Sequence, residues 1–443
     1  MLVKDILEIK NSKRLNGNGE IDYFSISTNN IKGKTLFIPL KGTTDGHNYI
    51  LNGVENGISG FFVEKSYDDI VKKAISINKD IIVIEVEDCL KALQELASLV
   101  RGKLKVPVIA LTGSYGKTSQ KEMLYSTLET EFNVLTSVGN FNNHIGMPLT
   151  LVNYHSEDIV LLELGSNHMG EIAFLRDICK PTITLVTSIG TPHIGNFKSL
   201  KNTLKEKTSI AQGSDYFLQN MDDNLLKDKT IKNMAVIKYG VNIDNIRNIT
   251  YGDKIKYTVN EDGTDYEITI NSDLNYLVNY SLCAIKIGLI LGMDMENIVK
   301  GIDSFRCGNS RMEKIIIGNH IIINDCYNAS YETIISGLDY FNNLEAEDKI
   351  VVIGDILELG KLSKKIHNDI GVYIYKQDMA FEEIHLVGAE MKKVYQYLKG
   401  KGFNVFHYNS VGEVNPNITE NKSVYLKASN GVGLKSLVPK NEN

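Results

Sequence analysis

One short segment, residues 106–118, constrains the fold of this chain more than any other. It reads Val-Pro-Val-Ile-Ala-Leu-Thr-Gly-Ser-Tyr-Gly-Lys-Thr, which is an apolar run followed by two glycines, a lysine and a threonine. The apolar run predicts a strand buried on both faces of a sheet, and apolar residues with the spacing of a helix follow Thr118. The glycines let the backbone turn tightly, so that backbone N–H groups and a helix N-terminus point at an anion. The segment therefore predicts a strand, a phosphate-binding loop and a helix, with a nucleoside triphosphate as the expected ligand.

The loop is shorter than the usual P-loop, because the position that should hold the first glycine is Leu111. The alternative is an ordinary glycine turn that carries a surface lysine. The preceding strand, and the apolar helical face of Leu124, Leu128 and Phe132, favour the phosphate loop. In it, Lys117 supplies a positive charge and Thr118 a hydroxyl that can bind a metal ion.

Length and composition narrow the class of protein. A chain of 443 residues suggests two or three domains, and its net charge of −6 gives no basic surface for a nucleic acid. No apolar run is long enough for membrane insertion, and the N-terminus lacks a signal peptide, so we expect a cytoplasmic protein. Five scattered cysteines form no C-x-x-C pair, which predicts buried, reduced thiols: Cys89, Cys179, Cys283, Cys307 and Cys326.

The pattern of strands and helices divides the chain into three α/β domains, at residues 1–85, 86–308 and 309–443. We expect strands at 36–40, 60–63, 106–111, 159–164, 183–189, 216–219, 315–324, 349–354, 385–388, 403–406 and 423–427. Amphipathic or apolar helices are predicted at 88–101 and 275–291, and a small antiparallel patch at 243–270. The central domain should hold a mostly parallel sheet with helices on its faces.

Polar residues at the predicted strand ends are the candidates for chemistry. Glu163 ends a buried strand, where a carboxylate is costly unless it is paired or binds a metal, so a Mg²⁺ ligand is favoured over a structural ion pair. His193 follows the next strand at the same edge of the sheet, although a lone histidine is more often a satisfied or surface residue. Lys207 lies on a helix, where a lysine is ordinarily solvated.

Three other segments gain weight only beside the phosphate loop. The amide-rich run 139–150 contains Asn140, Asn142 and Asn143, which are substrate candidates there and turn residues otherwise. Arg311 lies at a predicted domain junction, from which domain closure could bring it to triphosphate oxygens. The runs 324–330 and 354–360 follow it and would be turns if taken alone.

Taken together and in order, these runs resemble the Mur ligases, the ATP-dependent amide-forming enzymes of peptidoglycan synthesis, over nearly the whole chain. The matching runs begin at Thr112, Gly139, Glu163 and Ile189, the last ending at His193, and continue from Arg311, Asp325 and Gly354. The resemblance implies a central P-loop-type domain between a small N-terminal α/β domain and a C-terminal Rossmann-like α/β domain. It also implies that a carboxylate is activated as an acyl phosphate and then attacked by an amine.

The resemblance implies roles for individual residues. ATP would be bound by Thr112, Gly113, Ser114, Gly116, Lys117, Thr118, Asn279, Arg311, Asp325, Tyr327 and Asn328. Two Mg²⁺ ions would be held by Thr118, Glu163, His193 and a carbamoylated Lys207. Substrate contacts would include Thr28, Asp45, His47, Asn140, Asn142 and Asn143, and the catalytic set would be Lys117, His193, Lys207 and Arg311.

The N-terminal domain departs from the family pattern. An Asp-Ser/Thr-Arg triplet that contacts the uridine nucleotide is replaced by Ser27-Thr28-Asn29. We expect a monomeric ligase that joins D-alanyl-D-alanine to a UDP-muramoyl tripeptide. The alternatives are a related ligase that joins another amine to a carboxylate not borne on UDP-muramic acid, and a nucleotide-binding regulatory protein without turnover.

Overall fold

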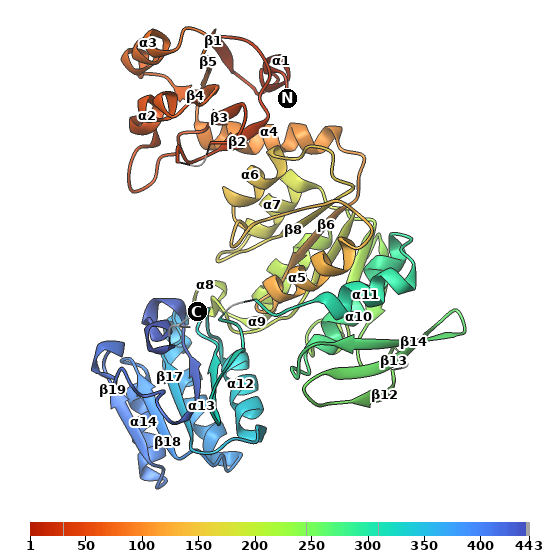
Figure 1. Ribbon diagram of the computed structural model, residues 1–443, viewed down its shortest axis with the longest axis vertical. Helices are drawn as coiled ribbons and strands as arrows, with labels where there is room; N and C mark the ends of the chain where they lie inside the picture. The colour runs from red at the N-terminus through yellow and green to blue at the C-terminus, as the bar shows by residue number, and fades with distance from the viewer. Residues whose placement is uncertain (30, 245, 309, 440–443) are drawn as a thin grey trace.

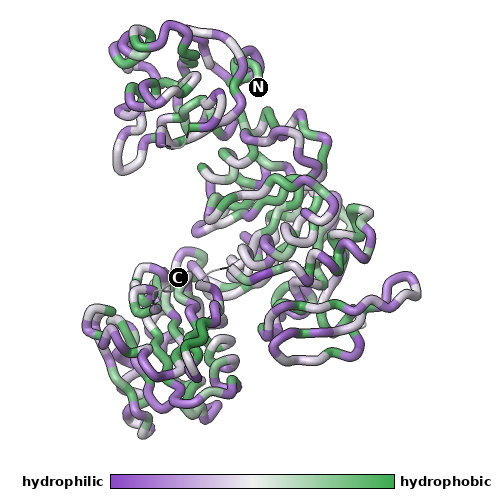
Figure 2. The backbone as a smooth tube through the Cα atoms, viewed as in Figure 1, coloured by the Kyte–Doolittle hydropathy of each residue, from purple (hydrophilic) through white to green (hydrophobic). Residues whose placement is uncertain are grey.

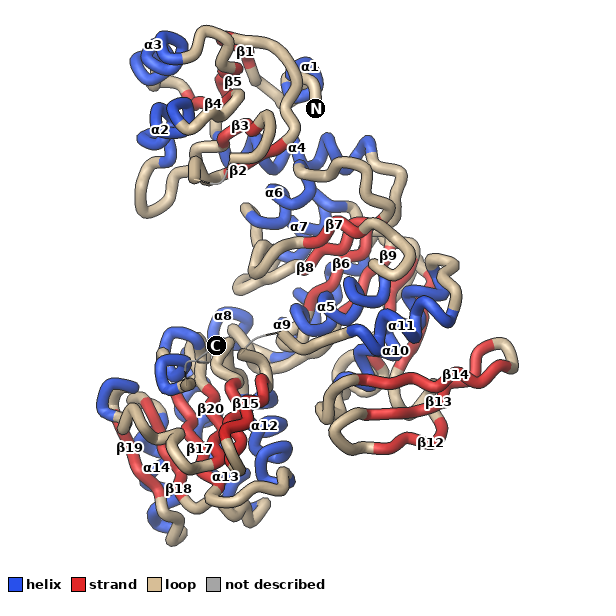
Figure 3. The backbone as a smooth tube through the Cα atoms, in the orientation of Figure 1, coloured by secondary structure: helices blue, strands red, loops and turns tan. Residues whose placement is uncertain are grey.

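The computed structural model describes residues 1–29, 31–244, 246–308 and 310–439, and it divides the chain into three α/β parts (Figure 1). Residue 309, where the C-terminal domain was predicted to begin, lies outside the described residues. Strands gather into one larger sheet in each part, with helices around them (Figure 3). Hydrophobic stretches follow these strands, and hydrophilic stretches lie largely in the loops between them (Figure 2). The predicted three-part α/β class is confirmed.

The N-terminal part is built on a five-stranded sheet in the order β1-β5-β4-β3-β2, and only β1 runs antiparallel to its neighbour. Its strands are β1 (Lys13–Asn16), β2 (Tyr23–Ser25), β3 (Thr35–Phe37), β4 (Gly60–Glu64) and β5 (Ile82–Val86). The helices are α1 (Val3–Ile6), α2 (Ile50–Glu55) and α3 (Asp68–Ile77). Phe61, Phe62 and Ile84 are completely buried and fill its core.

Helix α4 (Cys89–Lys103) connects the first two parts. It begins as predicted at Asp88, whose side chain accepts a hydrogen bond from the Lys91 backbone N–H at 2.8 Å. The helix packs mainly against α6 and α7 of the central part, and Arg101 near its end donates to the Cys179 carbonyl at 2.7 Å. Helix α4 therefore connects the N-terminal part to the helices of the central part.

The central part holds a six-stranded, all-parallel sheet in the order β11-β10-β9-β6-β8-β7, which confirms the predicted parallel sheet. Its strands are β6 (Val108–Thr112), β7 (Val134–Thr136), β8 (Ile159–Glu163), β9 (Ile183–Val186), β10 (Tyr216–Asn220) and β11 (Ala235–Tyr239). Its helices are α5 (Lys117–Leu128), α6 (Gly146–Val152), α7 (Glu171–Cys179), α8 (Ile194–Phe197) and α9 (Leu200–Thr208). Every residue of β6, β8 and β9 is buried, as expected for strands covered on both faces.

The predicted antiparallel patch is a three-stranded sheet of β12 (Arg247–Thr250), β13 (Ile255–Glu261) and β14 (Thr264–Ile270). Helices α10 (Leu277–Ile290) and α11 (Met295–Ser304) follow it and pack against α5. Figure 1 shows this sheet projecting from the far end of the central part. The contact of α10 and α11 with α5 supports the helix that begins at the phosphate loop.

The C-terminal part holds a six-stranded sheet in the order β15-β16-β20-β17-β18-β19. Its strands are β15 (Glu313–Ile317), β16 (His320–Asn324), β17 (Lys349–Gly354), β18 (Glu383–Val387), β19 (Val405–Tyr408) and β20 (Ser423–Lys427). Its helices are α12 (Tyr331–Asn343), α13 (Ser363–Lys376) and α14 (Met391–Gly400).

The prediction of one strand over 315–324 is wrong. Residues 313–324 form an antiparallel hairpin, in which Ile317 faces His320 across a two-residue turn. Gly318 adopts a φ of +58°, a conformation that glycine reaches without strain, and this reverses the chain. The Gly-Asn pair inside the apolar run was the local signal for the turn.

Two further expectations concern the cysteines and the membrane. Cys89, Cys179, Cys283 and Cys326 are free and buried as predicted, whereas Cys307 is only partly buried. Among the described residues, no helix combines the length and hydrophobicity that a membrane crossing requires.

The crossing of α11 over α5 yields a stability prediction. A Cβ at Gly301 would lie 2.4 Å from the Thr127 Cα, so Gly301→Ala must push α11 away from α5. We expect a loss of about 1–3 kcal/mol in the free energy of unfolding, measured by urea denaturation. Gly102→Ala is the matched control, because that helical glycine has open space around it and should gain about 0.4–1 kcal/mol. Equal stability of the two variants would contradict the close helix contact.

Candidate active site

The site forms where three parallel strands end side by side. Strand β6 lies between β8 and β9, and Leu111 pairs with Glu163 while Thr112 pairs with Val186. The phosphate loop therefore emerges between Glu163 and the loop that carries His193. Carboxyl ends of parallel strands are the usual ligand edge of such sheets.

The two glycines of the loop are required by its neighbours. A Cβ at Gly113 would lie 2.0 Å from the Thr187 hydroxyl, and one at Gly116 would lie 1.9 Å from the Tyr280 hydroxyl. Gly116 also has a φ of +77° immediately before α5 begins. Thr112 is completely buried and donates its hydroxyl to the Leu164 carbonyl at 2.7 Å, so Thr112 shapes the loop from below.

Lys117 folds back over this loop. Its Nζ donates to the Gly113 carbonyl at 2.9 Å and lies 3.4 Å from the Ser114 carbonyl. Burial lowers the pKa of Lys117, and nearby Glu163 opposes that shift. A desolvated ammonium at a phosphate loop favours an anionic ligand, because an anion replaces the stabilisation by water that burial has removed.

Glu163 is the only carboxylate among the described residues of β8, and it is almost completely buried. It accepts one hydrogen bond from the Thr118 hydroxyl at 2.9 Å and another from the Asn142 amide at 2.8 Å. The predicted ligand pair Thr118 and Glu163 is thus brought into contact. A carboxylate and a hydroxyl are the oxygen donors that Mg²⁺ prefers.

Lys207 lies deep in the same part of the molecule and is 1% exposed. Its Nζ is 2.9 Å from the Ser166 hydroxyl and 5.7 Å from the centre of the Phe197 ring. Burial, with a further contribution from the charge of Lys117, lowers the pKa of Lys207 to about 7. The amine is therefore substantially neutral and nucleophilic near pH 7.

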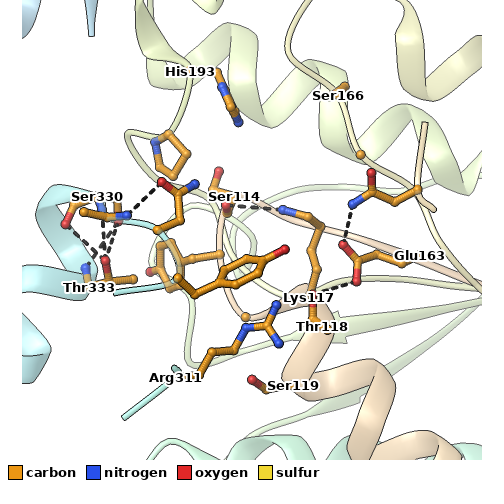
Figure 4. Close-up of a pocket in the computed structure, with 18 of the residues that line it drawn as sticks. Ser114, Lys117, Thr118, Ser119, Glu163, Ser166, His193, Arg311, Ser330 and Thr333 are labelled. Atoms are coloured by element: carbon orange, nitrogen blue, oxygen red, sulfur yellow. Dashed lines mark hydrogen bonds between the residues drawn. The ribbon is translucent and has the colours of Figure 1, made fainter. Parts of the chain in front are cut away.

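His193 extends its ring toward the phosphate loop from the segment that follows β9 (Figure 4). Its backbone φ of +57° is uncommon for a residue other than glycine. Burial lowers the pKa of His193, and Glu358 of the C-terminal part, whose carboxylate contacts its Nδ1, opposes the shift. His193 thus lies at the boundary between two parts of the chain.

One cavity of about 680 Å³ is lined by the phosphate loop, Glu163 and His193 together with residues of the C-terminal part. From the central part it is lined by Ser114, Gly116, Lys117, Thr118, Asn142, Asn143, Glu163 and His193, and from the C-terminal part by Arg311, Asp325, Tyr327 and Asn328. Of the predicted nucleotide and metal residues, Thr112, Gly113, Lys207 and Asn279 are not among its lining residues. The sequence therefore predicted twelve of the residues that line this cavity, although it could not show that a single cavity joins the two domains.

Arg311 bridges the two parts at the cavity. Its guanidinium stacks on the Tyr327 ring, 3.9 Å from the ring centre, and lies 3.7 Å from a Glu122 carboxylate oxygen on α5. Ser310 and Met312, on either side of it, both have positive φ. These conformations turn the chain sharply at the domain junction and direct Arg311 across it.

Asp325 is held by Lys427, which the sequence did not single out for that role. The Lys427 Nζ donates to Asp325 Oδ2 at 2.6 Å, and both side chains are almost fully buried. Burial raises the pKa of Asp325, and Lys427 opposes that shift. The pair links the end of β16 to β20 in the wall of the cavity, so Asp325 has a structural partner in addition to its predicted nucleotide role.

Several predicted residues have local partners away from the cavity. Asn140 is exposed and does not line it, and the Asn143 side chain accepts from the Ile145 and Gly146 N–H groups at the start of α6. Asn279 donates to Asn220 and Asp222, while its own Oδ1 is buried without a hydrogen-bond partner. That orphaned oxygen leaves Asn279 able to accept a donor from a ligand. Its nucleotide role stays a prediction.

The three candidates in the N-terminal domain lie apart from the cavity. Thr28 donates to Asn52 at 3.0 Å, and His47 is completely buried, stacked on Tyr67 and hydrogen-bonded to Asp45 at 2.7 Å. Although partial burial opposes the change, hydrogen bonds from Tyr67 and His47 lower the pKa of Asp45 to about 2. Asp45, His47 and Tyr67 thus form one network, and substrate contacts by Thr28, Asp45 and His47 stay predictions.

Sequence reasoning missed Glu332, Glu358 and Tyr280. Glu358 lies in the 354–360 run singled out in the sequence, but the sequence did not predict its contact with His193. Glu332 accepts from the Thr191 N–H at 2.9 Å, and Tyr280 covers Gly116. These contacts join segments far apart in the chain, and no local pattern indicated them.

The fold and the site define a class of protein: a phosphate-loop α/β protein in which a second α/β domain completes the cavity. The Mur ligase middle domain matches residues 111–289. UDP-N-acetylmuramoyl-tripeptide–D-alanyl-D-alanine ligase of Rickettsia prowazekii is 32% identical to this chain, and the match covers 98% of this chain and 96% of that ligase. The ligase of the same name from Bacillus subtilis is 29% identical, and the match covers 98% of this chain and 97% of that ligase. The chain belongs to the Mur ligase family.

Solved structures agree on the fold. A crystal structure of MurF from Acinetobacter baumannii matches with a TM-score of 0.84 at 23% identity, covering 98% of this chain and 97% of that one. MurF ligase from Thermotoga maritima in complex with ADP matches with a TM-score of 0.75 at 22% identity, covering 94% and 96%. At these identities the likeness shows that the fold is shared.

The low pKa of Lys207 yields a prediction about stability and pH. Between pH 7 and 10.5 the unfolded chain holds a proton that the native Lys207 has released, so the free energy of unfolding rises with pH in this window. Lys207→Met should therefore be more stable than the unmodified chain by about 1–4 kcal/mol at pH 7, with a gap that narrows toward pH 10. Urea denaturation in CO2-free buffer measures the gap.

Lys205→Met is the matched control, because Lys205 is an exposed lysine on the same helix α9. Its change should stay within about 0.5 kcal/mol at every pH. A Lys207→Met gap that is independent of pH would contradict the lowered pKa.

Proposed function

We propose that this chain is an ATP-dependent, ADP-forming ligase that joins D-alanyl-D-alanine to a UDP-muramoyl tripeptide. The observation that carries the proposal is the single cavity in which the phosphate loop, the buried Glu163 and the interdomain Arg311 meet. The full-length similarity to ligases of that name supports the choice of substrates. The cytoplasmic location expected from the sequence stays a prediction.

The residues fit a bound divalent cation. Glu163 is a buried carboxylate whose described partners are neutral donors, so its negative charge is not balanced by a direct ion pair. Thr118 adds a hydroxyl beside it, and His193 an imidazole on the next loop. Mg²⁺ bound by these groups would offset the negative charge of a triphosphate and of an approaching carboxylate.

Lys207 fits the metal set only in modified form. A protonated amine would repel the cation, whereas the neutral amine favoured by burial can attack CO2 through its nitrogen and lose a proton to form a carbamate. That carbamate is an anionic oxygen ligand in place of a cation. The complete burial of Lys207 and its lowered pKa support carbamoylation.

The residues of this chain would then act mainly by positioning and electrostatics. An acceptor carboxylate oxygen attacks the γ-phosphorus of ATP, the bond to ADP breaks, and an acyl phosphate forms. The amine nitrogen next attacks the acyl carbon, phosphate leaves with the bonding electrons, and the amine proton passes to solvent or to a base. Lys117 and the loop N–H groups would bind the phosphates, while Arg311 would reach them from the C-terminal part.

A second candidate function keeps this chemistry and changes the acceptor. Ser27, Thr28 and Asn29 carry no charge, and Thr28 is engaged by Asn52 within the domain. The uridine-contacting Asp and Arg of the family pattern are thus absent from these positions. This observation favours a carboxylate carried on another group.

Phosphate release from ATP tests both candidates. We expect release that depends on UDP-muramoyl tripeptide and D-alanyl-D-alanine together and that falls to background when either is omitted. Lys117→Ala should lower turnover by at least about 100-fold, because it removes the cation that neutralises the phosphates. Lys205→Ala, at an exposed lysine of α9, should retain full activity.

The other outcomes discriminate among the alternatives. Release with a different amine or carboxylate, but not with this pair, would support the second candidate. Nucleotide binding without stimulation by any acceptor would contradict both and leave a regulatory protein.

A further inference from the structure

The loop that carries His193 is clasped by the C-terminal part at three points. Glu358 places its carboxylate on the His193 Nδ1, and the Glu358 carbonyl accepts from the Gly195 N–H at 3.2 Å. A Cβ at Gly195 would lie 2.6 Å from that carbonyl oxygen, so the two backbones meet closely enough to require glycine. Glu332, in the first turn of α12, accepts from the Thr191 N–H at 2.9 Å and from its hydroxyl at 2.8 Å.

Both ends of the central contact are held in an unusual backbone conformation. His193 has a φ of +57° and Glu358 a φ of +63°, although neither is glycine. Such residues are uncommon, and they persist only where the surrounding structure holds them in place. The conformation brings the two side chains together across the domain boundary, so the meeting of His193 and Glu358 is a specific feature of the docked domains.

The geometry also determines which ring nitrogen of His193 is available. A neutral imidazole has one N–H donor and one lone-pair acceptor, and a carboxylate on Nδ1 selects the tautomer with the proton there. Nε2 then keeps its lone pair for a ligand. In metal sites a carboxylate on the second ring nitrogen commonly orients the imidazole and makes it a stronger ligand.

We propose that Glu358 is a positioning residue for the metal site: docking of the C-terminal part fixes the tautomer and direction of the His193 ring and so presents Nε2 to the divalent cation. Metal affinity is thereby coupled to the docking of the domain that carries Arg311. The inference rests on the proposed function, because that function supplies the metal role of His193.

The coupling has a consequence for the order of events. An undocked C-terminal part leaves His193 free to rotate and to change tautomer, which weakens the metal site. A docked part completes the metal site and brings Arg311 to the same cavity in one movement. The cation and the arginine therefore become available together.

The test compares two nearly isosteric variants, Glu358→Gln and Glu358→Met. The Glu358 side chain is 53% exposed, so neither replacement leaves a hole in the core. Gln keeps an oxygen that accepts from Nδ1–H, whereas Met keeps the volume without an acceptor of comparable strength. Mn²⁺ binding in the presence of ADP is measured by electron paramagnetic resonance, without acceptor or amine, and unfolding temperatures are recorded for both variants.

We expect Glu358→Met to weaken Mn²⁺ binding by about 10-fold or more, and Glu358→Gln to restore most of the affinity. Glu347→Ala, at an exposed carboxylate elsewhere on the same domain, should bind as the unmodified chain does. If Glu358→Met does not fold, Glu358→Ala takes its place in the comparison.

Unchanged Mn²⁺ affinity in the Met or Ala variant would overturn the inference and leave the proposed ligase function standing. Equal weakening in the Gln and Met variants would also overturn it, because the hydrogen-bond acceptor would then be irrelevant. Absence of Mn²⁺ binding by the unmodified chain with ADP would instead overturn the metal site of the proposed function, and the inference with it.

Discussion

The ends of three adjacent parallel strands are the constraint on which this structure depends. Because β6 lies between β8 and β9, the phosphate loop can only emerge between Glu163 and the segment leading to His193. The hydrogen bonds of the sheet fix the spacing of these strand ends, whereas His193 reaches the edge on the segment that follows β9 and is contacted by Glu358 of the C-terminal part. The C-terminal part supplies an arginine, a second wall and the carboxylate that contacts His193.

Buried charge at this edge favours a ligand site over a purely structural network. Burial lowers the pKa values of both Lys117 and Lys207. Glu163 is also buried, and its hydrogen-bond donors are neutral groups. A buried charge is usually balanced by a close opposite charge, as Lys427 balances Asp325 at the cavity wall. At the phosphate loop the described side chains leave that balance incomplete, and a triphosphate with its cations has the complementary charges.

Local patterns in the sequence predicted the parts of this structure that are locally determined. The bounds of β17 and β20 agree with the predicted runs, and the strand, loop and helix at residues 106–118 were indicated by glycine and apolar spacing. The hairpin at Gly318 was missed because an isoleucine-rich run on each side concealed a two-residue turn. Contacts such as His193 with Glu358 were not predictable, because they depend on how two separate sheets are placed.

The N-terminal residues predicted to contact the acceptor lie apart from the cavity, and this separation has a physical consequence. The N-terminal sheet joins the central part through α4 and through the contact of β2 with α6, and its network of Asp45, His47 and Tyr67 lies apart from the cavity. We therefore expect substitutions at Ser27 or Asn29 to leave the charges at the phosphate loop undisturbed. The retained loop, Glu163 and Lys207 accordingly argue for retained chemistry. The identity of the acceptor has to be established separately, by measuring which compound binds to the N-terminal domain.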